Sequence, residues 1–583
     1  MGEKIISDNS LYHTNLSERT ALILVPHEDD EINMAGNLIP LLEEMGVTVF
    51  VAFLTNGDYE ISADIRIDEA VRALRLLGVS RDCILFFGYP DTLNYASCGH
   101  VYRNEGQPIL AENGRCETYG GAGFTDYSHV RFGSHSKYTH ECMFRDMRTL
   151  ILDIAPDLIV GVDLDLHADH RALSLLLDEV LCDIFRSFPE GKRPILLKRF
   201  AYSTAYNAPP DYYSDNLRET IRPHQTAPGG AIIDSSYYVW GKRIRIPVLK
   251  ENRGEGTASF EKTKIFQAML CHNSQKLKLK AERIINSDEV FFLRRTDSIS
   301  YHARVSATSG NPDYINDFRL NNMKDIDSYQ ESFGDYLWIP REDDEEKILT
   351  MEWEYEVVIE ALCIWGNIEG NPIQKIELSF SDGNNYFVGP LLERGKGLNF
   401  FLPKRIRSSY CKVKLLDVPQ GSGLAEIEVF SKKEHKKVFP PYIKMLFYDN
   451  FVYDYNRRIT EKRIKLGVYG ESGEVKWTIL RGDAEIAGNE LVLKDNSVVS
   501  VKLQLVKAPH VFDIVTITPR TNAWFIKLYC LHKVQKCRMT WAKICWSIEK
   551  RYVRYGRIKK ERGIMSVISM ITKQVKKKIG RVC

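Results

Sequence analysis

The stretch Thr20–Glu31, TALILVPHEDDE, joins six residues of strand character to a short polar segment. Thr20–Val25 is continuously apolar and rich in β-branched residues, which is typical of a strand buried on both faces of a sheet. Val47–Leu54 (VTVFVAFL) repeats this pattern, and the intervening residues Glu31–Met45 have helical spacing that Pro40 interrupts. A strand, a helix and a second buried strand predict a βαβ unit with parallel strands.

The alternation of strands and helices continues to about residue 185. A helix is predicted over Ser62–Leu77, because serine is favoured at N-caps and Gly78 follows. The later predicted elements are strand Cys83–Phe87, helix Glu141–Ile154, strand Asp157–Val162 and helix Ala168–Phe185. We therefore predict a Rossmann-like α/β domain over residues 1–300, with ligands at the carboxyl ends of its strands. Because no GxGxxG follows the first strand, a nicotinamide cofactor is not expected.

The pattern changes from about residue 345 onward. In Met351–Ile359, apolar residues alternate with glutamates, which predicts a half-buried strand. Similar segments predict an all-β sandwich domain over residues 301–433. The charged segment Lys432–Pro441 is predicted to be a linker. A small β-rich domain is predicted over residues 440–520, and the sequence indicates no function for it.

Composition narrows the class of protein. The chain has 583 residues, 44% hydrophobic and 27% charged, which excludes a disordered, collagen-like or coiled-coil chain. The twelve cysteines include no CxxC pair, so we expect neither a thiolate zinc site nor a disulfide framework. The first residues lack the pattern of a signal peptide, and no apolar run is long enough to cross a bilayer. We therefore expect a cytoplasmic protein.

Positive charge is concentrated in the last residues of the chain. Residues 531–583 contain 16 Lys and Arg but only two acidic residues, a net charge of +14, which leaves −12 for the rest of a chain of net charge +2. One apolar stripe at helical spacing is formed by Ile564, Ile568, Ile571, Val575 and Ile579. We predict a basic amphipathic helical tail over residues 521–583. It binds an anionic membrane surface or packs on the protein's own β-domain, and no nucleic-acid partner is expected.

Polar clusters follow two of the predicted parallel strands. His27, Asp29 and Asp30 come directly after the first strand. His167, Asp169 and His170 follow the strand that ends at Val162. Two histidines and a carboxylate from separate loops are the ligand set of a catalytic zinc site, in which a further carboxylate can act as general base. The competing interpretation is that the acids only stabilise a helix N-terminus and that the histidines are capping or surface residues.

These clusters carry a resemblance to a known family. PHEDDE at 26–31 resembles the [A/P]HPDDE signature of the PIG-L (LmbE-like) N-acetylglucosaminyl deacetylases, and HADH at 167–170 resembles their HPDH. Three further motifs match in type and order: Thr55-Asn56-Gly57, Arg66-x-x-Glu69 and Gly88-Tyr89-Pro90-Asp91. The resemblance covers roughly residues 18–300. The sequence departs from it at Glu28 and Ala168, where the family usually has proline.

The resemblance implies a zinc-dependent hydrolase that removes the N-acetyl group from an N-acetylglucosamine-type sugar, in cell-surface glycan or glycolipid biosynthesis. By this resemblance, the ligands of Zn2+ are His27, Asp30 and His170. The residues with catalytic roles are Asp29 as general base, His167 as oxyanion stabiliser or acid to the leaving amine, and Asp169 as the group that orients a histidine. The substrate-binding residues are Arg66, Asn56 and Asp91.

A second resemblance concerns residues 301–433. The turn Ser381-Asp382-Gly383 and the strand Gly423–Val429 resemble a discoidin-type, galactose-binding-like sandwich. Such a module would hold a glycan or serve as a structural domain. The expected partner is an N-acetylated sugar or glycan, and the expected location is the cytoplasm, with peripheral attachment to the inner face of the cell membrane. The alternatives are a non-catalytic glycan-binding protein and an amidase of the same family that acts on a non-sugar amide.

Overall fold

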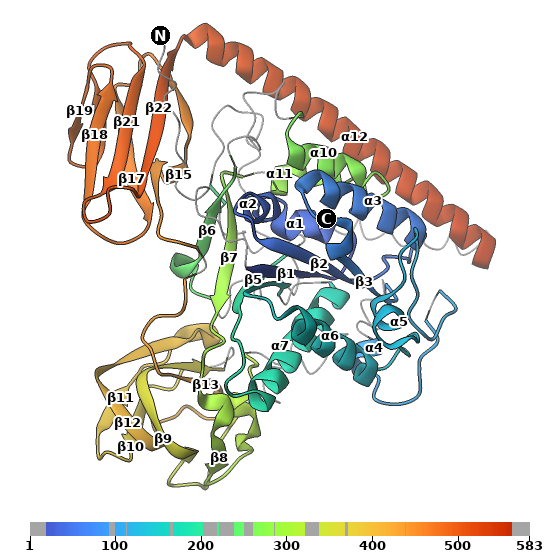
Figure 1. Ribbon diagram of the computed structural model, residues 1–583, viewed down its shortest axis with the longest axis vertical. Coiled ribbons are helices and arrows are strands. Elements are labelled where there is room, and N and C mark those ends of the chain that lie inside the picture. Colours follow the sequence, from blue (N-terminus) through green and yellow to red (C-terminus); the bar gives the residue numbers. More distant parts are fainter. Residues whose placement is uncertain are drawn as a thin grey trace, which may run out of the picture.

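The structure is a computed structural model, and it describes the chain with gaps. The described residues are 19–91, 100–111, 113–163, 167–201, 219–220, 238–249, 261–284, 286–320, 337–367, 371–437 and 439–562. They form an N-terminal α/β unit, two β-rich units and one long helix (Figure 1). This is the α/β plus all-β class that the sequence predicts.

The N-terminal unit is built on a seven-stranded sheet with the order β3-β2-β1-β4-β5-β7-β6. β1 to β5 are parallel, whereas β7 and β6 are antiparallel at one edge. The strands are β1 Thr20–Val25, β2 Thr48–Thr55, β3 Ile84–Tyr89, β4 Leu158–Val162, β5 Ile195–Arg199, β6 Ile244–Pro247 and β7 Asp288–Arg294. The α-helices are α1 Asp30–Ala35, α2 Leu38–Glu44, α3 Ala63–Leu77, α4 His100–Arg103, α5 Tyr127–Phe132, α6 His140–Ile154, α7 Ala168–Ser187, α10 Lys264–Cys271 and α11 Ala281–Ile284. The 3-10 helices are η1 Arg81–Cys83, η3 Trp240–Lys242 and η4 Leu277–Lys280.

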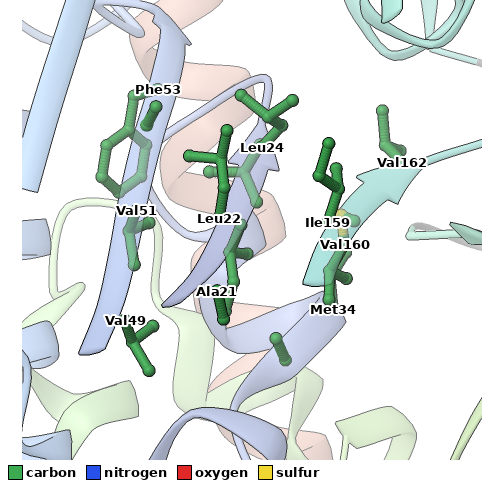
Figure 2. Close-up of a cluster of buried hydrophobic side chains, with 14 of the residues drawn as sticks. Ala21, Leu22, Leu24, Met34, Val49, Val51, Phe53, Ile159, Val160 and Val162 are labelled. Carbon is green, nitrogen blue, oxygen red and sulfur yellow. The ribbon is translucent and has the colours of Figure 1, made fainter. Parts of the chain in front are cut away.

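β1 forms the centre of this sheet. Every residue from Ala21 to Val25 is fully buried, because β2 and β4 flank the strand and helices cover both faces of the sheet. Figure 2 shows Leu22 of β1 between Val51 of β2 and Ile159 of β4. Burying each such aliphatic side chain contributes about 1.5–3 kcal/mol, so the apolar run that predicts the strand also stabilises the core.

The strand order changes direction between β1 and β4. β1 pairs with β2 on one side and with β4 on the other, and Leu24 lies beside Gly161 in this register. In open α/β sheets, ligands bind outside the carboxyl ends of the strands at such a switch point. The two acid–histidine clusters follow β1 and β4, so they leave the sheet next to each other.

The second unit is an antiparallel β-structure of order β11-β10-β12-β9-β13, with β8 paired to β9. Its strands are β8 Arg304–Ala307, β9 Ile348–Gly366, β10 Lys375–Phe380, β11 Asn385–Val388, β12 Leu398–Asp417 and β13 Leu424–Phe430, and its 3-10 helices are η5 Ser300–His302, η6 Pro312–Asn316 and η7 Glu393–Gly395. Register shifts between β9 and β12 allow these long strands to bend around the core. Trp353 and Trp365 are both buried.

An ion pair is buried where the first two units meet. Arg294 of β7 lies 2.9 Å from Glu428 of β13, and both side chains are at most 3% exposed. Trp365 donates a hydrogen bond of 2.8 Å to the other oxygen of Glu428. Burial would lower the pKa of Arg294, but Glu428 and Glu426 raise it above its ordinary value. The guanidinium therefore stays charged and pairs with the Glu428 carboxylate.

We expect Arg294→Met to destabilise the protein by roughly 3–5 kcal/mol, because the change leaves the buried Glu428 carboxylate without its cation. Urea unfolding followed by tryptophan fluorescence measures this loss. The control is Arg405→Met, because Arg405 lies 3.9 Å from Glu360 and is 66% exposed, so its contact contributes little. A change in stability that is equally small for both variants would contradict the role of Arg294.

The third β-rich unit has two sheets, of order β15-β14-β17-β20-β19 and β16-β22-β21-β18. Its strands are β14 Ile443–Phe447, β15 Asn450–Phe451, β16 Asp454–Arg458, β17 Arg463–Gly470, β18 Val475–Arg481, β19 Ala484–Ala487, β20 Glu490–Leu493, β21 Val499–Leu505 and β22 Phe512–Arg520. The Nη2 of Arg245 in β6 donates 2.8 Å to the backbone oxygen of Asp449, and the backbone N–H of Arg245 donates 2.7 Å to the Tyr469 hydroxyl. These bonds attach the third unit to the edge of the large sheet.

The long helix α12, Asn522–Arg562, begins two residues after β22 ends. Figure 1 shows it running past α10 and α3 of the α/β unit, and Met539 packs against the core of that unit. The tail helix therefore rests on the α/β unit as well as on the β-rich unit from which it starts. The predicted stripe from Ile564 to Ile579 lies outside the described residues. Among the described helices, none combines the length and the apolar character needed to cross a membrane.

Candidate metal centre and active site

The turn after β1 places the first group of polar side chains. The backbone N–H groups of Asp29 and Asp30 both donate to the carbonyl oxygen of His27, at 3.1 Å. Asp29 has a φ of 156°, a backbone conformation that is uncommon outside glycine. The turn is therefore tight, and α1 begins at Asp30. All the side chains from His27 to Glu31 are buried.

The second group of polar side chains lies at the start of α7, after β4. His167 is the N-cap residue, and its Nδ1 accepts a hydrogen bond of 3.2 Å from the backbone N–H of Asp169. Asp169 and His170 occupy the first turn of the helix, 3% and 0% exposed. Since Nδ1 of His167 accepts, a neutral His167 carries its proton on Nε2.

Two of the predicted ligands, His27 and His170, face the same oxygen of the third, Asp30. Asp30 Oδ2 lies 3.2 Å from His27 Nδ1 and 3.2 Å from His170 Nε2. In a tetrahedral site with ligands at about 2.0–2.1 Å, neighbouring ligand atoms are roughly 3.3 Å apart. Both imidazoles therefore face the Asp30 carboxylate at this spacing, and the chemistry of His27, Asp30 and His170 suits a divalent metal such as zinc. Burial would raise the pKa of Asp30, but the two rings hold it well below its usual value, so the carboxylate is ionised.

The other nitrogen of His27 faces two more carboxylates. Its Nε2 lies 3.1 Å from Asp169 Oδ2 and 3.3 Å from Asp91 Oδ1. Burial would lower the pKa of His27, but the carboxylates of Asp91, Asp169 and Asp30 raise it well above its usual value. A carboxylate behind a metal-binding histidine fixes its tautomer and raises its basicity. Asp169 is thus placed to orient a histidine, and Asp91 shares that position.

His167 completes a cluster of three imidazoles. The nitrogen atoms that His27, His167 and His170 offer lie within 4.8 Å of one another, and a second group of this kind joins His27, Asp91, His167 and Asp169. Burial and the neighbouring rings of His27 and His170 lower the pKa of His167 to about 4. His167 is therefore neutral near pH 7 and can donate a hydrogen bond without carrying charge.

Lys280 is a residue of this site that the sequence patterns do not indicate. Its Nζ lies 2.8 Å from Asp29 Oδ2, and Arg66 Nη2 lies 3.7 Å from Asp29 Oδ1. Lys280 ends η4, and the residues before η4 are anchored by His272, which contacts Glu31 at 2.6 Å, and by Ser274, which donates to Glu69. The acids Glu31 and Glu69 of the sequence motifs thus hold the segment that brings Lys280 to Asp29.

We expect Lys280→Met to lower the turnover number roughly tenfold or more, because a charge-assisted hydrogen bond to Asp29 is lost. Steady-state kinetics measures this loss. Lys278→Met is the matched control, since Lys278 lies on the same 3-10 helix and is exposed. Restoration of the rate by Lys280→Arg would support a role of the charge. Equal rates for the two methionine variants would contradict it.

The predicted substrate-binding residues Arg66 and Asn56 are engaged within the protein. Arg66 donates 2.8 Å to the backbone oxygen of Glu28 and 3.3 Å to that of Gly57, and the Asn56 amide donates 2.8 Å to the backbone oxygen of Tyr119. Both side chains are buried, at 6% and 0% exposure. In this structure they support the loops around the candidate metal ligands, and a contact with substrate stays a prediction for both.

Gly57 and Glu28 form a close contact beside Arg66. Gly57 has a φ of 56°, and a Cβ at this position would lie 2.2 Å from Glu28 Oε2, so only glycine fits. Burial raises the pKa of Glu28 to about 8, and Arg66, with an Nη2 3.7 Å from Glu28 Oε2, partly opposes this rise. Glu28, at a position where the resembling family usually has proline, is therefore mostly protonated near pH 7.

Acid and imidazole groups thus gather at the switch point of the α/β sheet, and they form a donor set that could hold a metal ion. Residues 22–181 match the family model described as PIG-L, GlcNAc-PI de-N-acetylase, so this part of the chain is a PIG-L domain. The match to this family supports the interpretation that the domain is a hydrolase with N-deacetylase activity. No curated protein matches the chain.

Several solved structures are similar to the chain. One is N,N′-diacetylchitobiose deacetylase from Pyrococcus horikoshii in complex with its inhibitor MPG, at 18% identity over 48% of this chain and 84% of that chain, with a TM-score of 0.26. A second is a deacetylase of the teicoplanin biosynthesis pathway, at 17% identity over 48% of this chain and 99% of that chain, with a TM-score of 0.27. A third is the family 32 carbohydrate-binding module of Clostridium perfringens NanJ in complex with galactose, at 18% identity over 22% of this chain and 94% of that chain, with a TM-score of 0.18.

Proposed function

We propose that this protein is a zinc-dependent N-deacetylase that releases acetate from an N-acetylglucosamine-type sugar. The observation that carries the proposal is the pair of 3.2 Å contacts that Asp30 Oδ2 makes with His27 and His170, within a PIG-L domain. His27, Asp30 and His170 would hold the metal. When bound, zinc lowers the pKa of a water toward about 7 and polarises an amide carbonyl.

Asp29 is the base in this proposal. Its carboxylate adjoins the proposed metal ligand Asp30 in the chain, and Lys280 and Arg66 hold it from the other side. Asp29 accepts a proton as the oxygen of water forms a bond to the acetyl carbon. It then returns the proton to the sugar nitrogen as the C–N bond breaks, so the amine leaves, and the second proton of the water stays on acetic acid, which ionises to acetate in solution.

His167 stabilises the negative charge that develops on the acetyl oxygen. Its Nδ1 accepts from the backbone N–H of Asp169, so the proton on Nε2 is the one that can be donated. A neutral imidazole suits this task, because a positioned donor stabilises an oxyanion without a further proton transfer. Of the two roles that the family resemblance leaves open for His167, we propose oxyanion stabilisation and not protonation of the amine.

The substrate and its location are the finer parts of the proposal. We place the reaction in cell-surface glycan or glycolipid biosynthesis, in the cytoplasm, with the enzyme attached to the inner face of the membrane through its basic tail. The second β-rich unit would hold the glycan. An amidase that acts on a non-sugar amide, and a glycan-binding protein without catalysis, are the competing functions.

A panel of amides tests the proposal. The zinc-loaded protein is incubated with N,N′-diacetylchitobiose, with N-acetylglucosaminyl-phosphatidylinositol and with an N-acetylated amino acid, and acetate release is measured. Release from one of the sugars but not from the amino acid is the expected result. Release from the amino acid alone would favour the amidase, and no release from any compound by zinc-loaded protein would favour the glycan-binding protein.

A further inference from the structure

Helix α12 presents two opposite apolar faces. One face contains half-buried residues at helical spacing, which include Phe525, Leu528, Met539 and Trp546. The other face is a line of exposed residues, which we call the outer stripe. The outer stripe consists of Ile526, Cys530, Val534, Cys537, Trp541, Ile544, Ile548 and Tyr552.

The inner face attaches the helix to the rest of the protein. Arg458 of β16 stacks over the Phe525 ring at 4.4 Å, Met539 packs against the core of the α/β unit, and Lys550 lies 3.9 Å from Glu60. The helix also contacts η4, the element that carries Lys280. The orientation of α12 is therefore fixed by its contacts along its length, and the outer stripe is turned away from the protein.

The outer stripe is apolar along its length. Its spacing of three or four residues keeps it on one side of the helix, and at about 1.5 Å per residue it extends for roughly 39 Å. Trp541 is 67% exposed, Ile548 62% and Tyr552 81%. An apolar surface of this length that faces water is typical of a site that binds another surface.

The charges that border the outer stripe indicate which kind of surface the stripe binds. From Asn522 to Tyr552 the helix has seven Lys and Arg and one acidic residue, Glu549. A second copy of the helix would bring the same positive charge to the contact, which disfavours self-association. An anionic lipid surface offers the opposite charge, and tryptophan and tyrosine are suited to its interface. A nucleic acid would also attract the positive charges, but its charged backbone offers no apolar surface to the exposed isoleucine and tryptophan side chains.

We infer that α12 is an in-plane membrane anchor whose outer stripe inserts into an anionic lipid surface. This inference extends the proposed placement of the enzyme at a membrane and names the surface that makes the contact. Because the inner face of the helix rests on the α/β unit, the lipid lies about 10–12 Å, one helix diameter, from that unit. A lipid-linked sugar would thereby be held close to the PIG-L domain.

Vesicle co-sedimentation of the full chain tests the inference. The stripe variant is Trp541→Glu with Ile548→Glu, and the control is Val468→Glu with Leu480→Glu, which changes the charge equally at exposed positions of the third unit. The vesicles are pure phosphatidylcholine or contain about 30% phosphatidylglycerol. We expect the wild type and the control to prefer anionic vesicles and the stripe variant to bind them about tenfold more weakly.

Three results would overturn the inference. These are absence of wild-type binding, equal binding by the stripe variant, and a wild-type dimer in light scattering that the stripe variant dissociates. The last result would identify a second copy as the occupant of the outer stripe. Acetate release from soluble N,N′-diacetylchitobiose is measured on the same samples and should be equal for all three proteins. A failure of the anchor is thereby distinguished from a failure of the deacetylase.

Discussion

Replacing Asp29 with asparagine is expected to lower the turnover number by about 10²–10⁴-fold, the range that a general base contributes. Asparagine keeps the shape of the side chain and can still accept the hydrogen bond from Lys280, but it cannot accept a proton at neutral pH. Because Asp29 is not one of the proposed metal ligands, zinc content should stay at about one per chain. Initial rates of acetate release and metal analysis on the same preparation measure both quantities.

The control for Asp29→Asn is Asp68→Asn, an exposed carboxylate that pairs with Arg72 on α3. We expect this variant to keep the wild-type rate. If Asp29→Asn kept a rate within about fivefold of the wild type, the base would have to be another group. If it lost its zinc, Asp29 would be a ligand and the roles of Asp29 and Asp30 would be exchanged.

Replacing His170 with alanine should remove the metal and with it all activity. His170 is fully buried, and its Nε2 faces the carboxylate of Asp30. A zinc site that loses one of three protein ligands should lose more affinity than the 10–100-fold that is typical of changes behind the ligands. Equilibrium dialysis against zinc measures the affinity, and circular dichroism shows whether the fold is kept.

Two further variants distinguish the loss of a metal ligand from changes behind the ligands or outside the site. Asp169→Asn changes a group behind His27, so it should weaken zinc binding by about 10–100-fold and not abolish it. His129→Ala, on α5 and outside the ligand group, should bind zinc as the wild type does. Full zinc affinity in a folded His170→Ala protein would contradict the proposed ligand set.

The strands that surround the switch point could be predicted because their signal is local. β1 and β4 are short runs of apolar residues, and each is buried by its neighbours in the sheet. The strand β5 gives no such signal, because it ends in Lys198 and Arg199, which are nonetheless buried. Lys198 is neutralised by Asp178 at 2.7 Å, a partner that the pattern of one strand cannot indicate. The antiparallel edge formed by β7 and β6 was missed for the same reason, since β7 begins with buried acids.

The candidate site also has one part that the sequence predicts and another part that it does not. The residues that follow β1 and β4 lie together because parallel strands end at one edge of the sheet, so the sequence predicts their proximity. Lys280 reaches Asp29 from 251 residues away in the chain, through a loop that His272 and Ser274 attach to α1 and α3. No local pattern marks this lysine. The only sequence signal for this contact lies in Glu31 and Glu69. Both acids belong to the family motifs, but neither is expected to bind metal or to take part in catalysis.

The position of the bound metal distinguishes the proposed ligand set from the neighbouring side chains. Crystals of zinc-loaded protein are measured at the zinc absorption edge, and the anomalous difference map locates the ion without reference to activity. We predict one peak at about 2.0–2.2 Å from His27 Nδ1, Asp30 Oδ2 and His170 Nε2. A peak among His167, Asp169 and Asp91, or no peak in protein soaked with zinc, would contradict the proposed metal centre.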